Sequence, residues 1–225
     1  MLSTPYISAD YEFVYEPSED SFLFLDTFEE HPPVPVSKTP VVVEIGTGSG
    51  IITTFLKMHN LIPGAFHIMT DVNEMALQAA KNTLERNCTG NVSPAYADTL
   101  RCSLTDSFRS ESIDMLFFNP PYVPSESVPQ LPTSSCSGEY DSSRGDWLDL
   151  ALVGGDDGME VTQLLLDDLP RVLASKGEAY VLFCKRNKHE EVTARFRNKW
   201  GWRVELIVEK KCAWEVLCIY RFSKP

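Results

Sequence analysis

The four residues Asn119-Pro120-Pro121-Tyr122 have side chains that can hold a flat amide or amine group. They follow the apolar run 113–118, whose composition predicts a buried strand of a parallel sheet. Two prolines cannot continue a strand, so Asn119 ends it at the sheet edge where open α/β folds bind ligands. The Asn119 side-chain oxygen and the Pro120 carbonyl can accept both hydrogens of an NH₂ group, and the Tyr122 ring can stack on it.

A glycine-rich loop, Glu44-Ile45-Gly46-Thr47-Gly48-Ser49-Gly50, joins a predicted strand at 41–45 to a helix that runs to about Lys57. Its glycines allow a ligand to approach the backbone closely. A dinucleotide fingerprint would need glycine at position 51, where Ile51 stands. The carboxylate of Glu44 disfavours a pyrophosphate and favours a cation or an amino group. The loop therefore predicts a site for S-adenosylmethionine, which carries a sulfonium and an ammonium.

Two further acids follow the next two predicted strands. Asp71 ends the strand 66–70, where an acid can accept the ribose hydroxyls, and Asp98 follows the strand 92–97, where it can accept from an adenine amine. Each acid alone reads equally well as a helix cap or a turn residue. Together with Glu44 and Asn119 they end four successive strands, and four polar side chains along one sheet edge predict a cofactor site.

Strands and helices alternate along the chain, which predicts a single α/β domain over 1–225 with a mostly parallel, doubly wound sheet. The first forty residues, 1–40, form an arm, a helix that begins at 16–21 and a proline-rich linker. Residues 123–157 form an irregular insert, interpreted as a lid on the substrate side. The remaining predicted elements are helices at 73–87, 158–174 and 188–199, a strand at 178–184, and an antiparallel strand pair at 204–208 and 216–220.

Composition limits the partners and the compartment. The formal net charge is −12 and the pI about 4.8, so tight unaided binding to nucleic acid is not expected, and a basic partner fits better. The six cysteines show no metal-ligand spacing, which predicts no metal site in this chain. With no signal peptide and no apolar run of about 20 residues, we expect a protein of the cytoplasm, and also of the nucleus, with no membrane attachment.

These motifs together resemble the class I, seven-stranded methyltransferases. The segments 15–21 (YEPSEDS) and 147–159 (WLDLALVGGDDGM) are similar to the eukaryotic members of the HemK-type glutamine methyltransferases, and the resemblance runs from about Pro5 to the C-terminus. It implies methylation of the glutamine side chain in the Gly-Gly-Gln motif of the eukaryotic class-one translation release factor, alone or with its GTPase partner. It also implies that the chain is the catalytic subunit of a heterodimer with a small zinc-binding activator subunit.

The resemblance assigns roles by position. Those implied to contact the cofactor are Ser21, Glu44, Gly46, Gly48, Gly50, Asp71, Val72, Asp98, Thr99 and Asn119. Those implied to bind the substrate are Asn119, Pro120, Pro121 and Tyr122, of which Asn119, Pro120 and Tyr122 are the catalytic set. Many relatives have leucine where this chain has Thr99, so a backbone contact is implied there rather than a side-chain role.

Three alternatives remain open on the sequence alone. An adenine-N6 methyltransferase of nucleic acid uses the same Asn-Pro-Pro-Tyr motif to hold an amino group, but the acidic net charge and the lack of a basic stripe in the sequence count against it. A histone-lysine methyltransferase is a close variant, since an acidic surface attracts a basic tail. A methyltransferase fold kept only as a binding module is the non-enzymatic alternative. The strand 92–97 is a candidate edge for the partner, although it reads equally well as a core strand.

Overall fold

The computed structural model describes residues 1–35, 37–89, 96–131 and 144–225. Its first half contains α1 (Glu19–Glu30), β1 (Val41–Ile45), α2 (Ile51–Met58), β2 (Phe66–Asp71), α3 (Glu74–Asn87), β3 (Ala97–Arg101), β4 (Ile113–Phe118) and β5 (Val123–Pro124). Its second half contains α4 (Arg144–Leu152), β6 (Val153–Gly155), η1 (Asp156–Gly158), α5 (Glu160–Val172), β7 (Leu173–Cys184), η2 (Lys185–Asn187), α6 (His189–Trp200), β8 (Arg203–Cys212) and β9 (Glu215–Ser223). None of the described helices is long and apolar enough to cross a lipid bilayer.

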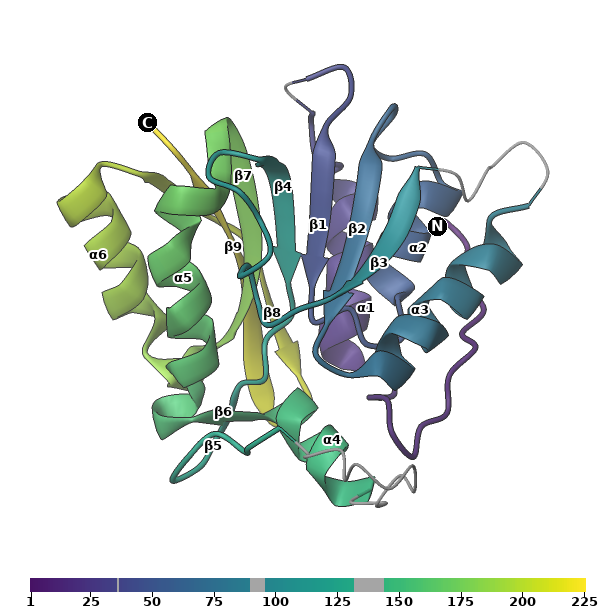
Figure 1. The fold of residues 1–225 in the computed structure, drawn as a ribbon. Helices are drawn as coiled ribbons and strands as arrows, with labels where there is room; N and C mark the ends of the chain where they lie inside the picture. The colour runs from purple at the N-terminus through teal and green to yellow at the C-terminus, as the bar shows by residue number, and fades with distance from the viewer. Residues whose placement is uncertain (36, 90–95, 132–143) are drawn as a thin grey trace.

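Seven strands form one twisted sheet in the order β3-β2-β1-β4-β7-β9-β8 (Figure 1). The first five strands in this order pair in parallel, and β9 is antiparallel to both β7 and β8. This confirms the predicted mostly parallel sheet with an antiparallel C-terminal pair. The strand order reverses between β1 and β4, and open α/β sheets bind ligands beside the carboxyl ends of such strands. The loops after β1 and β4 therefore open onto the same crevice.

Helices cover both faces of the sheet, with α5 and α6 on one face and α1 and α2 on the other (Figure 1). Alternate residues of β4 show the two cores: Leu116 and Phe118 pack with α5, whereas Met115 and Phe117 pack with α1 and α2. All four are at most 2% exposed. A strand that is apolar on both sides is typical of the centre of a parallel sheet, and it holds the β4 end rigidly at the crevice.

The N-terminal arm runs along α3 (Figure 1). The Tyr6 N–H donates to Asn87 Oδ1 at 2.8 Å and the Ser8 N–H donates to Thr83 Oγ1 at 3.1 Å. Near its end, the Phe13 carbonyl accepts from Asn73 Nδ2 at 2.8 Å. These contacts lead the chain to the carboxyl edge of the sheet before α1 begins, so that the start of α1 lies beside the end of β4.

Two of the predicted elements are wrong. The structure places β3 at Ala97–Arg101 rather than at 92–97, of which 92–95 lie outside the described residues. Tyr96 has φ of 66°, a left-handed conformation that a strand cannot contain, so the strand starts after it. The insert 123–157 is also not wholly irregular, because α4 forms within it and β6 pairs in parallel with β5.

Candidate active site

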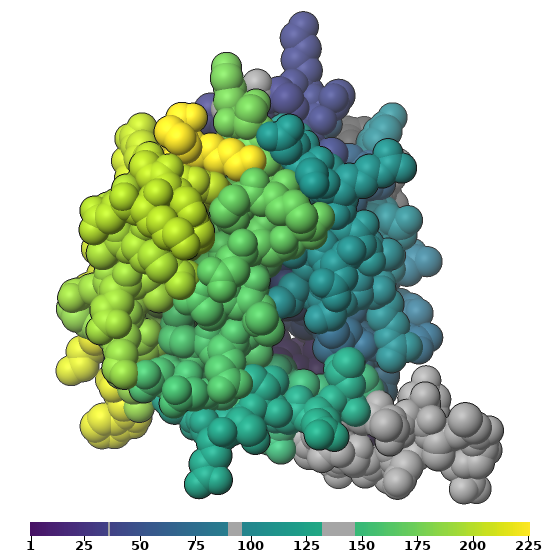
Figure 2. All heavy atoms as spheres, turned by 60° about the vertical axis from the view of Figure 1, so that its left-hand side comes forward, coloured from purple at the N-terminus to yellow at the C-terminus, as the bar shows by residue number. Residues whose placement is uncertain are grey.

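A cavity of about 310 Å³ lies at the carboxyl edge of β1, β2 and β4. Figure 2 shows the surface hollowed between the green α5 side and the teal β3 side, with purple atoms of the N-terminal segment visible inside. The arm, α1, α4 and α5 complete its walls. The ionisable carboxylates of the lining are Asp20, Glu44 and Asp71, and among the described lining residues there is no lysine, arginine or histidine. The cavity therefore suits a cationic ligand, and its described lining offers no cationic side chain for a phosphate.

The glycine loop after β1 takes a shape that suits only glycine at its alternate positions. Gly46 and Gly48 have φ of 61° and 52°, in the left-handed region. The loop is fixed to β2, because the Thr47 N–H donates to the Thr70 carbonyl at 2.8 Å and the Gly48 N–H donates to Asp71 Oδ2 at 3.0 Å. Both glycines line the cavity, as predicted.

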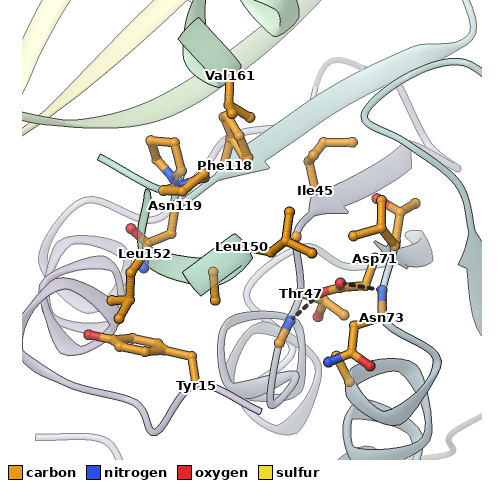
Figure 3. Close-up of a pocket in the computed structure, with 18 of the residues that line it drawn as sticks. Tyr15, Ile45, Thr47, Asp71, Asn73, Phe118, Asn119, Leu150, Leu152 and Val161 are labelled. Carbon is orange, nitrogen blue, oxygen red and sulfur yellow. Dashed lines mark hydrogen bonds between the residues drawn. The ribbon is translucent and has the colours of Figure 1, made fainter. Parts of the chain in front are cut away.

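Asp71 is held at the carboxyl end of β2 by two backbone groups. Besides Gly48, the Asn73 N–H donates to Asp71 Oδ1 at 2.9 Å (Figure 3). Asn73 in turn caps α3, because its Oδ1 accepts from the Met75 N–H at 2.9 Å. Burial raises the pKa of Asp71, against the lowering effect of these backbone hydrogen bonds. The carboxylate is thus preorganised at the cavity wall beside Val72, which also lines it.

Glu44, the fourth residue of β1, is 3% exposed. Its Oε2 accepts from the Thr53 N–H at 3.0 Å, in the first turn of α2, where the helix dipole favours a negative charge. Burial nevertheless raises the pKa of Glu44 to about 7, an effect larger than the lowering by the hydrogen bond from the Thr53 N–H. The nearby Asp71 carboxylate raises it further. The site therefore buries a negative charge that no cation of the described cavity lining offsets.

Asn119 stands at the opposite side of the cavity from Asp71 (Figure 3). Its Nδ2 donates to Asp20 Oδ2 at 2.9 Å, whereas its Oδ1 is buried and has no hydrogen-bond partner among the described residues. A buried acceptor without a donor is costly, so this oxygen is available to accept from a ligand N–H. Leu152 and Tyr15 lie next to Asn119 (Figure 3), which gives this end of the cavity apolar walls.

The segment after Asn119 is held in place by Asn187 of η2 and by the turn 154–158. The Asn187 side chain, 1% exposed, donates from Nδ2 to the Tyr122 carbonyl at 3.1 Å and to the Asp157 carbonyl at 2.6 Å. Gly158 has φ of 69°, and a Cβ added there would overlap the Tyr122 carbonyl and lie 2.5 Å from Asn187 Nδ2. Gly154 and Gly158 therefore pack against the backbone of 121–122 with no space for a side chain at either position.

The structure places most of the predicted site residues together. The cavity lining contains Ser21, Glu44, Gly46, Gly48, Asp71, Val72, Asn119, Pro120, Pro121 and Tyr122. Tyr122 is half-buried, and burial together with the Asp20 carboxylate raises its pKa. These residues converge on the cavity from four separate segments of the chain, as the predicted site requires.

Three predicted residues lie elsewhere. Asp98 is the second residue of β3, paired with Ile68 and exposed, and neither it nor Thr99 lines the cavity. Because β3 starts later than predicted, the chain reaches the cavity only at 102–104. Gly50 does not line the cavity either: with φ of 76°, it lets α2 pack on α3, since a Cβ there would lie 2.6 Å from Ala80 Cα.

Sequence reasoning missed two residues of the cavity lining, Asp20 and Tyr15, and also Asn187, which holds the backbone at Tyr122. The first two stand inside the segment 15–21, which the sequence singled out only for its resemblance and for the start of a helix. Asp20 contacts Asn119, which is 99 positions away along the chain, and Tyr15 contacts Asp20, so both reach the site through the tertiary fold. Asn187 has no sequence signal, because it follows β7 in a short turn without a motif.

Comparison with known proteins identifies the family. The profile of the methyltransferase small domain matches residues 18–131. The eRF1 methyltransferase catalytic subunit mtq2 of Schizosaccharomyces pombe is 32% identical over 100% of this chain and 96% of its own length. The chain belongs to the small-domain methyltransferases of the HemK type. Methyltransferase HEMK2 of Homo sapiens is 29% identical over 94% of this chain and 90% of its own length.

Solved structures agree with this assignment. The Mtq2 chain in the E. cuniculi Mtq2–Trm112 complex, described as responsible for methylation of the translation termination factor eRF1, superposes with a TM-score of 0.63. It is 25% identical, and the alignment covers 94% of this chain and 99% of that one. The class I methyltransferase fold and the resemblance to the HemK-type enzymes are thus confirmed.

Proposed function

We propose that this chain is the catalytic subunit of a heterodimer that methylates the glutamine side-chain nitrogen of the Gly-Gly-Gln motif in the class-one release factor eRF1. The observation that carries the proposal is the buried Asn119 Oδ1, which has no partner among the described residues and lies in a cavity whose described charged residues are all acidic. The relatives named eRF1 methyltransferase and Mtq2 support the substrate, since they align over nearly the whole chain. The adenine and histone-lysine alternatives are not favoured.

The cavity fits S-adenosylmethionine at its Asp71 end. That cofactor supplies an electrophilic methyl group on a positively charged sulfur. Of this chain's residues, Asp71 and Val72 would hold its ribose side, and Gly46 and Gly48 would let it approach the backbone. Buried Glu44 supplies negative charge near the loop, and Ser21 lines the adjoining wall. A phosphate-bearing cofactor finds no cationic partner in the described lining.

The acceptor end has the chemistry for a neutral carboxamide. Asn119 Oδ1 and the Pro120 carbonyl would each accept one hydrogen of the substrate NH₂ group. Two such hydrogen bonds fix the direction of the nitrogen lone pair and favour charge building on nitrogen, which an amide otherwise resists because its lone pair is delocalised. The half-buried Tyr122 would pack against the flat group. In this proposal, the enzyme accelerates methyl transfer mainly by holding the substrate nitrogen in position.

The proposal extends to the assembly. The solved Mtq2 relative is paired with Trm112, and we propose that a small zinc-binding subunit of this kind completes the enzyme here. We propose further that the whole chain forms one domain and that the insert 123–157, of which 132–143 lie outside the described residues, acts as a lid over the acceptor end. We also propose that the enzyme works in the cytoplasm with access to the nucleus.

Mass spectrometry of methyl acceptors tests the function. The full chain, purified with and without the Trm112-type subunit, is incubated with S-adenosylmethionine and each of three acceptors: eRF1, a lysine-rich histone-tail peptide and an adenine-containing oligonucleotide. A gain of one methyl group on the Gly-Gly-Gln glutamine, lost when that glutamine is replaced by asparagine, is the expected result. Methylation of the peptide or the oligonucleotide with eRF1 unmodified would overturn the substrate.

A further inference from the structure

Asp20 is a buried carboxylate that the proposed reaction does not yet use. It is 5% exposed and is the second residue of α1. Its Oδ1 accepts from the Ser21 N–H at 2.7 Å and from the Tyr15 hydroxyl at 3.3 Å. Its Oδ2 faces the other way and accepts from Asn119 Nδ2 at 2.9 Å. The carboxylate is thus anchored on one oxygen and bound to Asn119 through the other.

A carboxylate only accepts hydrogen bonds, whereas a carboxamide can both donate and accept. Asp20 therefore forces the NH₂ group of Asn119 to face it, and the Asn119 oxygen must point the opposite way. That oxygen is the buried atom left without a partner. A hydrogen bond from the NH₂ group to a charged acceptor also polarises the amide, which makes its oxygen a stronger acceptor for the substrate.

We infer that Asp20 is a positioning residue for methyl transfer, which acts by fixing the orientation of the Asn119 carboxamide and strengthening its free oxygen as an acceptor. This inference rests on the proposed function, because it gives the free oxygen a substrate N–H to accept. Without Asp20, the Asn119 amide can turn over and present its NH₂ group to the substrate NH₂ group, and two donors repel.

A purely structural reading of Asp20 makes a different prediction. The residue also ties the N-terminal arm to α1 through Tyr15 and satisfies the Ser21 N–H. If holding these two segments were its sole role, its replacement would lower stability and cofactor binding, and a compensating change at Asn119 would restore nothing. The orientation role instead requires that the effects at Asp20 and Asn119 depend on each other.

A reciprocal exchange separates the two roles. Asp20→Asn, Asn119→Asp and the double variant are prepared as full chains in complex with the Trm112-type subunit, and kcat and KM for eRF1 are measured at saturating S-adenosylmethionine. In the double variant, Asn at 20 can donate to Asp at 119, whose second oxygen again faces the substrate as an acceptor. Asp26→Asn is the matched control, since Asp26 lies on the same helix in an exposed pair with Lys210.

We expect Asp20→Asn to lower kcat about 10- to 100-fold at saturating S-adenosylmethionine, because a charge-assisted hydrogen bond is lost. The double variant is expected to turn over faster than Asp20→Asn, and Asp26→Asn to match the wild type. A double variant no faster than Asp20→Asn, or an Asp20→Asn enzyme with wild-type kcat, would overturn the inference.

A readout independent of activity separates this inference from the proposed function. The side-chain NH₂ resonances of Asn119, assigned by their loss in Asn119→Ala, are expected to shift in Asp20→Asn and to stay in place in Asp26→Asn. If the wild-type complex leaves eRF1 unmodified, the proposed function fails by itself. Unshifted Asn119 resonances in Asp20→Asn would then refute the orientation role on separate grounds.

Discussion

The substitution Glu44→Gln tests the raised pKa of the buried Glu44 carboxyl group. The Glu44 carboxyl has a pKa of about 7 in the folded chain against an ordinary value of 4.5. Between these values the folded state binds more protons than the unfolded state, so this group makes the free energy of unfolding fall as pH rises. At about 1.4 kcal/mol per pH unit, the gap amounts to about 3 kcal/mol in total, of which about 2 kcal/mol develops between pH 5 and pH 8.

Replacement by glutamine removes this titration, while the side-chain oxygen can still accept from the Thr53 N–H. We therefore expect Glu44→Gln to gain stability relative to the wild type as pH rises from 5 to 8, by about 2 kcal/mol. Urea unfolding of both chains without ligand, at half-unit pH steps, measures the difference. Glu85→Gln, the same change on the exposed side of α3, is the control. Parallel stability curves for wild type and Glu44→Gln would refute the reasoning.

Three further predictions concern the cavity and its support. Asn119→Ala should lower turnover more than about 100-fold and leave the cofactor dissociation constant, measured by calorimetry, within about threefold; a lost cofactor site would instead make Asn119 structural. Asp71→Ala should weaken cofactor binding at least about tenfold, because a hydrogen bond to a charged group is lost, and unchanged affinity would remove Asp71 from the site. Gly158→Ala should destabilise the chain by more than about 1 kcal/mol beyond Gly201→Ala, which shares a left-handed φ but meets no atom within 4 Å. Equal thermal shifts for the two glycine variants would contradict the close packing of Gly158 on Tyr122.

The central strands could be predicted from the sequence because their signals are local. β1 and β4 have the predicted bounds, Val41–Ile45 and Ile113–Phe118, since glycines end one apolar run and prolines end the other. β3 could not be located in this way. Tyr96 is not a glycine, so nothing in the sequence indicates its left-handed backbone conformation. Because β3 starts only after Tyr96, Asp98 lies within the strand and away from the cavity.

The candidate site, like the fold, could be predicted only in part from the sequence. Glu44 and Asp71 lie at the carboxyl ends of β1 and β2, and Asn119 directly follows β4. The strand order places these ends along one edge of the sheet, so topology alone brings the three residues together. Asp20 reaches the same cavity, and Asn187 holds the backbone of Tyr122 at its wall, through contacts that depend on how α1 and the turn after β7 pack. No spacing in the chain encodes those contacts. The residues that orient the site therefore needed the structure, whereas those that define its chemistry did not.

The most direct test of the central claim is a crystal structure of the heterodimer with S-adenosylhomocysteine and a peptide that carries Gly-Gly-Gln. We predict that the glutamine side-chain nitrogen lies about 3 Å from both Asn119 Oδ1 and the Pro120 carbonyl oxygen, with the cofactor ribose at Asp71. A glutamine side chain bound elsewhere, or an Asn119 oxygen turned toward Asp20, would contradict the account.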